Sequence, residues 1–307
     1  MRILIAGNDG QLAACIRQSA QRLNIDAICV GRPDLDLTIP QTITDTFDRV
    51  KPDVVVNVAA YTDVDLAEDQ LEQAMLVNGQ GAGLVASACQ EFDIPLIHIS
   101  TDYVFDGENI TPYIERDVVS PINAYGRSKL MGEDKVALNT KKHVILRTSW
   151  VYSPCGKNFL KTMLNLAHSG KRELKIVNDQ FGNPTSAIDL AGAIIKIAEN
   201  LVQNPDDKQL FGIFHLSGSG ITNWADFALK IFEYSREIDG PYSEVFGIPS
   251  SEYPTKAQRP KNSRLDCSKI AAIHGIALPV WEKSTKIAVT KYLELQDWRT
   301  KKPRNAQ

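Results

Sequence analysis

Cysteine is scarce in the 307-residue sequence, and the pattern of its cysteines excludes two classes of structure. The five cysteines are scattered, with no CxxC pair and no paired Cys/His spacing. A zinc site built on such spacings and a dense disulfide framework are therefore both excluded. A reducing compartment fits this usage, and we expect a cytoplasmic protein.

Long apolar runs and a strong charge of one sign are also missing. No 18-residue apolar span is present for a membrane helix, and residues 1–6 run straight into glycines without a signal-peptide pattern. The net charge is −3, and the basic run from Arg299 to Arg304 is explained by a solvated terminus. We therefore expect neither a membrane nor a nucleic acid as a partner.

The sequence has enough apolar residues for a large core, at 43% hydrophobic and 23% charged. Apolar runs alternate with helical patterns, and the run at 53–60 is nearly continuously apolar, as in a parallel strand covered on both faces. This predicts an α/β fold, a Rossmann-type doubly wound parallel sheet, with a dinucleotide-binding core at 1–150. The rhythm loosens over 151–307, which we predict to be mainly a smaller C-terminal substrate-binding lobe, with about 174–216 returning to the core.

A glycine turn follows the first predicted strand. Its spacing is G-x-x-G-x-x-A, from Gly7 through Gly10 to Ala13. Glycines let backbone N–H groups approach a pyrophosphate at the positive end of the following helix. The turn therefore predicts a dinucleotide site.

Arg32 follows the second predicted strand, where such a fold places the adenosine ribose. An arginine suits a 2′-phosphate, so NADPH is expected, with NADH still possible. The alternative is a solvated loop arginine. Ala59 and Ala60, at the end of the third strand, are small enough to let a cofactor pass close.

The proposed chemistry lies where the fourth strand ends. Thr101 falls at its carboxyl end, and Tyr125 and Lys129 are four residues apart, on one face of a predicted helix. A nearby ammonium would lower the pKa of the phenol and make it a usable acid. A chance surface pair would show the same spacing.

Two further residues have two interpretations each. Trp150 ends the fifth strand and either orients a ring-shaped substrate or anchors the core. Asn78 falls within a helix predicted over 68–93 and is either a surface residue or a fastener of neighbouring strand backbones.

Seven blocks of the sequence resemble the extended short-chain dehydrogenase/reductase superfamily and, within it, the dTDP-4-dehydrorhamnose reductases. The blocks occur in the same order, at 7–12, 57–65, 100–107, 125–129, 147–152, 179–185 and 259–266. The resemblance implies that NADPH reduces C4 of a dTDP-4-keto-6-deoxy sugar to give dTDP-L-rhamnose. Tyr125 would donate the proton, Thr101 would hydrogen-bond the same oxygen, and Lys129 would hold the nicotinamide ribose.

Two sets of site residues follow from the motifs and the resemblance. The predicted cofactor residues are Gly7, Asp9, Gly10, Gln11, Leu12, Arg32, Asp36, Ala59, Ala60, Tyr61 and Lys129. The predicted substrate residues are Thr101, Asp102, Tyr125, Trp150, Asn158 and Arg259, of which Asn158 and Arg259 would meet the diphosphate.

The sequence departs from the family at one place that matters for metals. Some members bridge subunits with Mg²⁺ through an acidic residue just after the glycine turn, where this chain has Ala14, Cys15 and Ile16. We predict no metal there, because the segment offers no side-chain oxygen, and a homodimer, if formed, would be held otherwise.

Three alternatives remain open. The chain could reduce another nucleotide-linked 4-keto-6-deoxy sugar, or serve as a non-catalytic regulatory subunit of this fold. It could also be an epimerase or dehydratase, although a dehydratase would carry acidic residues after Thr101, and only Asp102 is there.

Overall fold

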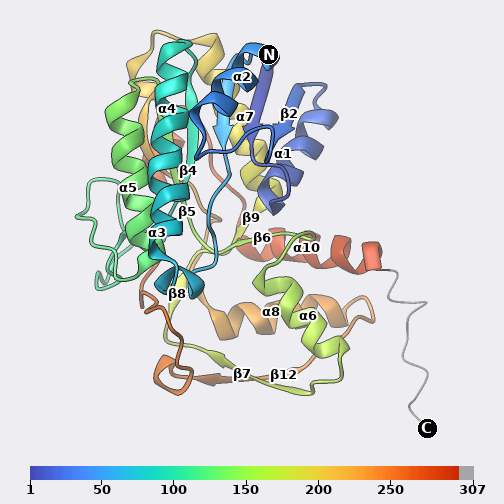
Figure 1. Ribbon diagram of the computed structural model, residues 1–307. Helices are drawn as coiled ribbons and strands as arrows, with labels where there is room; N and C mark the ends of the chain where they lie inside the picture. The colour runs from blue at the N-terminus through green and yellow to red at the C-terminus, as the bar shows by residue number, and fades with distance from the viewer. Residues whose placement is uncertain (297–307) are drawn as a thin grey trace.

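A six-stranded sheet forms the upper part of the computed structural model, which describes residues 1–296 (Figure 1). Its strands are β1 (Arg2–Ala6), β2 (Asp26–Val30), β3 (Val54–Asn57), β4 (Leu96–Thr101), β5 (His143–Thr148) and β10 (Gly212–His215). They run in the order β10-β5-β4-β3-β1-β2, and every pair is parallel. The prediction of a doubly wound parallel sheet is confirmed.

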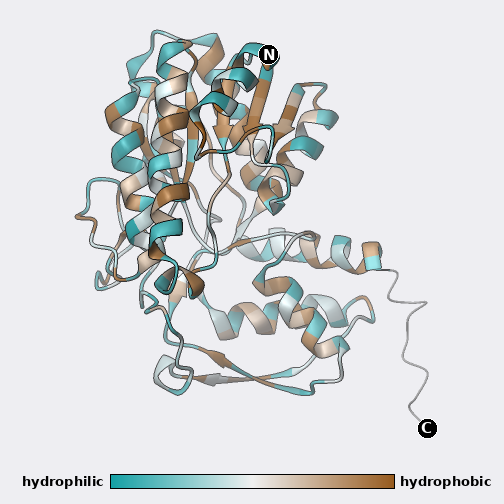
Figure 2. Ribbon diagram, in the orientation of Figure 1, coloured by the Kyte–Doolittle hydropathy of each residue, from teal (hydrophilic) through white to brown (hydrophobic). Residues whose placement is uncertain are grey.

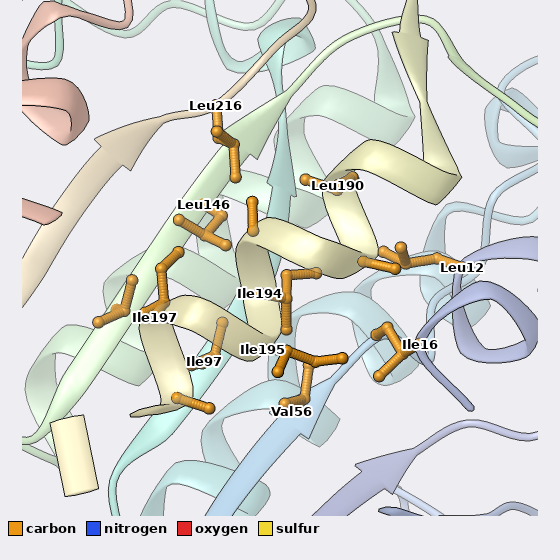
Figure 3. Close-up of a cluster of buried hydrophobic side chains, with 14 of the residues drawn as sticks. Leu12, Ile16, Val56, Ile97, Leu146, Leu190, Ile194, Ile195, Ile197 and Leu216 are labelled. Carbon is orange, nitrogen blue, oxygen red and sulfur yellow. The ribbon is translucent and has the colours of Figure 1, made fainter. Parts of the chain in front are cut away.

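Helices cover both faces of this sheet because successive strand residues point to opposite sides. On one face α1 (Gln11–Arg22) packs against α7 (Ala187–Gln203), over Val56, Ile97 and Leu146 of the strands (Figure 3). The other face carries α2 (Pro40–Val50), α4 (Ala82–Glu91) and α5 (Ala124–Asn139). Figure 2 shows the apolar strands enclosed between these helices.

The strand order reverses between β1 and β3. The chain runs outward from β1 to β2 on one side, and from β3 to β4 and β5 on the other. A crevice opens at the carboxyl ends of strands where the order reverses, and ligands bind there in open α/β sheets. The glycine turn and the segment after β3 both reach this point.

The helix predicted over 68–93 is interrupted. A 3₁₀ turn (Leu66–Glu68) and α3 (Leu71–Ala74) precede a π-helical segment, η2 (Met75–Gly81), which contains Asn78 and leads into α4. The Asn78 side chain accepts from the Tyr61 N–H at 2.8 Å and donates to the Tyr61 carbonyl and the Ser128 hydroxyl, both at 2.9 Å. Asn78 thus fastens the loop after β3 to α5. Such π segments often occur at functional sites.

The lower part in Figure 1 is smaller and less regular. It contains α6 (Phe159–His168), β7 (Glu173–Val177), α8 (Trp224–Arg236), β12 (Glu244–Ile248) and α10 (Trp281–Gln296), and β7 pairs with β12. The remaining short elements of the whole molecule, in both parts, are η3 (Asp102–Val104), β6 (Val151–Tyr152), β8 (Phe181–Gly182), β9 (Thr185–Ser186), η4 (Lys208–Leu210), β11 (Thr222–Asn223), η5 (Ser250–Glu252) and α9 (Ser268–His274).

The C-terminal half contributes to both parts of the molecule. β10 is an edge strand of the six-stranded sheet, and α7 packs on one face of that sheet. β7 instead lies in the lower part, paired with β12. The division at residue 150 stays a prediction. The basic run Arg299 to Arg304 lies outside the described residues, and within residues 1–296 no helix is long and apolar enough to cross a membrane.

Candidate active site

A cavity of about 920 Å³ opens where the strand order reverses. Its walls come from the segments that follow β1, β2 and β3. The lining includes the predicted cofactor residues Gly7, Asp9, Gly10, Arg32, Asp36, Ala59, Ala60 and Tyr61. Gln11, Leu12 and Lys129, also predicted to contact the cofactor, lie outside this lining.

The glycine turn is shaped for a ligand that approaches the backbone. Gly7 has φ +123°, and a Cβ on it would lie 3.0 Å from the Val58 side chain and 3.2 Å from the Ala59 nitrogen. Gly10 caps α1, and a Cβ there would meet nothing within 4 Å. The first N–H groups of α1 are thus open to an anion, so the residues present fit a dinucleotide pyrophosphate.

Arg32 and Asp36 lie on the same wall of this cavity. Arg32 is exposed, whereas the Asp36 carboxylate accepts from the Thr38 N–H at 2.9 Å and the Thr38 hydroxyl at 2.7 Å. These bonds and the nearby charge of Arg32 lower the pKa of Asp36. Asp36 therefore shapes the turn, and the Arg32 guanidinium is the group on this wall suited to an anion.

Gln11 and Asn158 meet at the junction of the two parts. Gln11 Nε2 donates to the Val151 carbonyl at 3.1 Å, and its Oε1 accepts from the Ser153 hydroxyl at 3.0 Å and from Asn158 Nδ2 at 3.1 Å. Asn158 also caps α6 through the Lys161 N–H. Both side chains thus brace the junction, and their predicted ligand contacts stay predictions.

The three residues predicted to be catalytic come from β4 and α5. Thr101 is the last residue of β4, and Asn123 caps α5 by accepting the Gly126 N–H at 2.7 Å. A Cβ on Gly126 would collide with the Tyr103 carbonyl, so glycine allows α5 to start close against η3. This contact brings the Tyr125 phenol within hydrogen-bonding reach of the Thr101 hydroxyl.

The electrostatics of Tyr125 differ from the sequence-based expectation. Burial raises the pKa of the phenol, the charge of Asp102 raises it further, and the Thr101 hydrogen bond lowers it. Lys129 points to β4 instead, where Nζ donates to the Ile99 carbonyl at 2.6 Å. In the chain by itself, burial and Asp102 therefore set the direction of the Tyr125 pKa shift, and the lowering expected from Lys129 does not.

Burial also changes the ionisation of Lys129 and Asp102. Burial lowers the pKa of Lys129 to about 8, against the raising effect of Glu133. Burial raises the pKa of Asp102 to about 6, opposed by hydrogen bonds from Ser263 and Thr101. Both groups thus change charge close to neutral pH, which is typical of functional sites.

The Thr101 hydroxyl is already engaged on two sides. It donates to Asp102 Oδ1 at 2.8 Å and accepts the Tyr103 N–H at 3.1 Å. A hydroxyl has one proton to donate. Thr101 must therefore release Asp102 before it can donate to a substrate oxygen.

A second cavity, of about 820 Å³, lies in the lower part, among α6, β7, α8 and β12. Its lining combines aromatic and apolar side chains with a few polar ones. They include Asp65, Phe159, Met163, Gln180, Trp224, Ile248, Tyr253 and Arg259. A concave site of this composition suits a ligand with both a ring and charged groups.

Trp150 packs beside this cavity. Its ring stacks on Trp224 with centroids 3.5 Å apart, and a Cβ on Gly182 would collide with it. Trp150 also has φ +47°, a conformation rarely adopted by a bulky residue. This packing supports the core-anchor interpretation and places Trp224, rather than Trp150, on the cavity wall.

Arg259 reaches the second cavity and is already paired. Its guanidinium donates to Asp65 at 2.7 and 3.1 Å, and the Ala257 N–H donates to the same carboxylate at 3.0 Å. An incoming diphosphate would compete with Asp65 for this arginine. The sequence does not single out Asp65 and Trp224 as candidate site residues, because their contacts with Arg259 and Trp150 join positions far apart in the chain.

A metal site would need several ligating side chains close together. Over residues 1–296 no three or more His, Cys, Asp or Glu side chains are grouped so as to hold a metal ion. Within the segment 14–16, where the sequence predicts no metal, Cys15 is buried against the core between α1 and α7.

Comparisons with known proteins identify relatives along nearly the whole chain. The family described as RmlD substrate binding domain matches residues 1–294. The dTDP-4-dehydrorhamnose reductase of Sinorhizobium fredii is 46% identical over 286 residues, covering 93% of this chain and 96% of that protein. The enzyme of the same name from Escherichia coli K12 is 39% identical, with the same coverage of each chain.

A solved structure shows the same fold. The crystal structure of dTDP-4-dehydrorhamnose reductase from Bacillus anthracis, in complex with NADP, has a TM-score of 0.87 and 33% identity. The match covers 94% of this chain and 99% of that one.

Proposed function

The chain belongs to the dTDP-4-dehydrorhamnose reductase family, and we propose that it reduces the C4 keto group of dTDP-4-dehydro-L-rhamnose to give dTDP-L-rhamnose with NADPH. The observation that carries this proposal is the close approach of the start of α5, which bears Tyr125, to the carboxyl end of β4, which bears Thr101. Lys129 lies one turn further along the same helix, and a cavity suited to a dinucleotide opens at the neighbouring strands.

The cofactor is held by residues around the first cavity. The N–H groups at the start of α1 receive the pyrophosphate, and Arg32 pairs with the 2′-phosphate, which favours NADPH over NADH. When bound, NADPH supplies the hydride. Lys129 holds the nicotinamide ribose, for which its ammonium must turn from the Ile99 carbonyl or share its protons with it.

The proton comes from Tyr125. Negative charge develops on the C4 oxygen during reduction, and the phenol donates to that oxygen while the Thr101 hydroxyl hydrogen-bonds it. The Tyr125 phenol is protonated at neutral pH and has a proton to donate, but burial raises its pKa and so makes it a weaker acid in the chain by itself. Lys129, protonated when the ribose is bound, stabilises the phenolate that remains.

The second cavity is the proposed site of the nucleotide diphosphate. Trp224 offers a flat apolar surface for the base, and Arg259 offers a guanidinium for the diphosphate once it separates from Asp65. Asp102 and Trp150 would act through their neighbours, Asp102 through Thr101 and Trp150 through Trp224.

A panel of sugars tests the proposal. The full-length protein is mixed with NADPH and dTDP-4-dehydro-L-rhamnose, or with 4-keto-6-deoxy sugars on other nucleotides, and the product sugar is identified. Fastest NADPH oxidation with the dTDP-linked sugar and formation of dTDP-L-rhamnose are expected. Binding of NADPH without reduction of any sugar would favour a regulatory subunit, and a faster rate on another nucleotide would reassign the substrate.

A further inference from the structure

His98 is buried in the middle of β4, behind the proposed active site. Its ring lies between Asn57 at the end of β3 and Lys129 on α5. Nδ1 is 3.2 Å from Asn57 Nδ2, and Nε2 is 3.5 Å from Lys129 Nζ. All three side chains are at most 2% exposed, so water does not intervene freely.

The orientation of the Asn57 amide determines which nitrogen of His98 carries the proton. Asn57 Oδ1 accepts the Ala59 N–H at 3.2 Å, and a flipped amide would set two donors against each other there. The Asn57 NH₂ group therefore faces His98, and Nδ1 of the ring must accept. A neutral imidazole that accepts at Nδ1 carries its proton on Nε2.

This tautomer has a consequence for Lys129. An ammonium group has three donors and no acceptor, so it cannot accept the Nε2–H of His98. A neutral amine can accept that proton with its lone pair while it donates to the Ile99 carbonyl at 2.6 Å. Only the neutral amine satisfies both contacts at once.

We propose that His98 is a positioning residue for Lys129: its Nε2–H favours the neutral form of the lysine amine over the ammonium and fixes the place of the amine beneath the active site. Ribose oxygens that accept protons from Lys129 then favour the ammonium when cofactor binds. This inference rests on the proposed function in taking Lys129 as the lysine that holds the ribose.

The charged groups around this pair leave the two forms of Lys129 close in free energy. Glu133, one turn further along α5, favours the ammonium, but its carboxylate is already paired with Arg147 at 2.6 Å and bonded by the Ser100 hydroxyl. Tyr125 lies one turn before Lys129 and is protonated. Burial lowers the pKa of the His98 imidazole, and Lys129 and His143 on β5 lower it further. His98 therefore stays neutral, and Lys129 is the group that changes charge.

The first test observes the tautomer directly. Nitrogen chemical shifts of the five histidines are recorded on the full-length protein with ¹⁵N-labelled histidine, and His98 is assigned from the signal lost in His98→Phe. A neutral ring protonated at Nε2, unchanged between about pH 6 and 9, is expected. A ring protonated at Nδ1, or an imidazolium at neutral pH, would overturn the proposal.

The second test reverses the tautomer. Asn57→Asp keeps the acceptor for Ala59 but places a second acceptor against Nδ1, so Nε2 becomes an acceptor for the Lys129 ammonium. NADPH affinity, measured by fluorescence, should fall above pH 8 in the wild type, where Lys129 loses its proton. In Asn57→Asp the midpoint should move up by about one pH unit, the scale of a reversed hydrogen bond.

A double variant separates the histidine from the new charge. In His98→Phe/Asn57→Asp the carboxylate remains but cannot act through the ring. The midpoint of the double variant should therefore lie close to that of His98→Phe alone, so that most of the upward shift caused by Asn57→Asp vanishes. An equal shift with and without His98 would assign the effect to charge alone and would contradict the proposal.

A matched substitution controls for general destabilisation. His215→Phe removes another buried imidazole, on β10, which contacts the Tyr113 carbonyl. His98→Phe should move the midpoint of the pH dependence of NADPH affinity upward, because loss of the Nε2–H favours the ammonium of Lys129, and His215→Phe should leave the midpoint unchanged. An equal shift in both variants, or no shift in His98→Phe, would overturn the positioning role. If the wild type reduced no sugar, the proposed function would fail, while the tautomer and the midpoint would still decide the role of His98.

Discussion

Lys129 on α5 donates a 2.6 Å hydrogen bond to the backbone carbonyl of Ile99 on β4. Because Lys129 is almost completely buried, this bond fastens the helix that carries Tyr125 to the strand that ends in Thr101. The relative placement of the proposed acid and its hydroxyl partner thus depends on a contact between a side chain and the backbone.

Tyr125→Phe should abolish sugar reduction while NADPH binding is retained. The phenol is the only proton donor assigned to the C4 oxygen, whereas the ring packing survives in phenylalanine. Turnover is measured by NADPH oxidation with dTDP-4-dehydro-L-rhamnose, and affinity by fluorescence titration. Thr101→Val is the comparison, with an expected loss of about 10²–10³ in rate, the scale of one oxyanion hydrogen bond. Reduction at the wild-type rate by Tyr125→Phe would show that another group is the acid.

Arg32→Ala should raise the Michaelis constant for NADPH about tenfold or more and leave that for NADH nearly unchanged. The reason is the loss of a charge-assisted contact to the 2′-phosphate, a group that NADH does not have. Arg17→Ala, on the exposed side of α1, removes the same charge outside the lining of the cofactor cavity and should change neither constant. Equal effects of Arg32→Ala on the two cofactors would remove Arg32 from this role.

Asp102→Asn should stabilise the fold at neutral pH. Burial raises the pKa of Asp102 from 3.8 to about 6, so above pH 6 the folded protein holds a carboxylate that is more favourable in the unfolded chain. At about 1.36 kcal/mol per unit, the penalty is about 3 kcal/mol and disappears as pH falls through 6 towards 3.8. Thermal unfolding should show a higher melting temperature for the variant at pH 7.5 and a smaller difference at pH 5.

Asp106→Asn is the control of opposite sign. Its carboxylate accepts from the Tyr113 phenol at 2.6 Å, and this hydrogen bond is the main cause that lowers its pKa. The folded state is therefore stabilised by this charge above the unfolded pKa, and the variant should be less stable at pH 7.5. A stabilised Asp106→Asn, or an Asp102→Asn variant without any pH-dependent gain, would contradict this assignment.

Dialysis against EDTA should leave the rate of sugar reduction unchanged. The acid assigned to the reaction is Tyr125, and the proposed charge stabilisation comes from Lys129, so no step requires a Lewis acid. Activity is assayed before and after dialysis, with magnesium added back in a parallel sample. Loss of activity that magnesium restores would show that a metal takes part in the reaction or in assembly.

The sequence by itself determined the elements whose rules are local. Strands with continuous apolar residues, the glycine turn after β1 and the i, i+4 spacing of Tyr125 and Lys129 each depend on neighbours within a few positions. For this reason the parallel sheet could be predicted, and so could the place of the proposed chemistry at the end of β4.

Only the tertiary structure decided which side chains meet across long separations. Asp65 pairs with Arg259, 194 residues away, and Trp224 covers Trp150 beside the second cavity. Asn78 lies in a π segment where the sequence predicts a continuous helix, and its amide bonds the Tyr61 backbone, 17 residues away. The neutral form proposed to be favoured at Lys129 likewise depends on Asn57 of β3 and His98 of β4, because the place of a proton is set by the donors and acceptors that packing brings together.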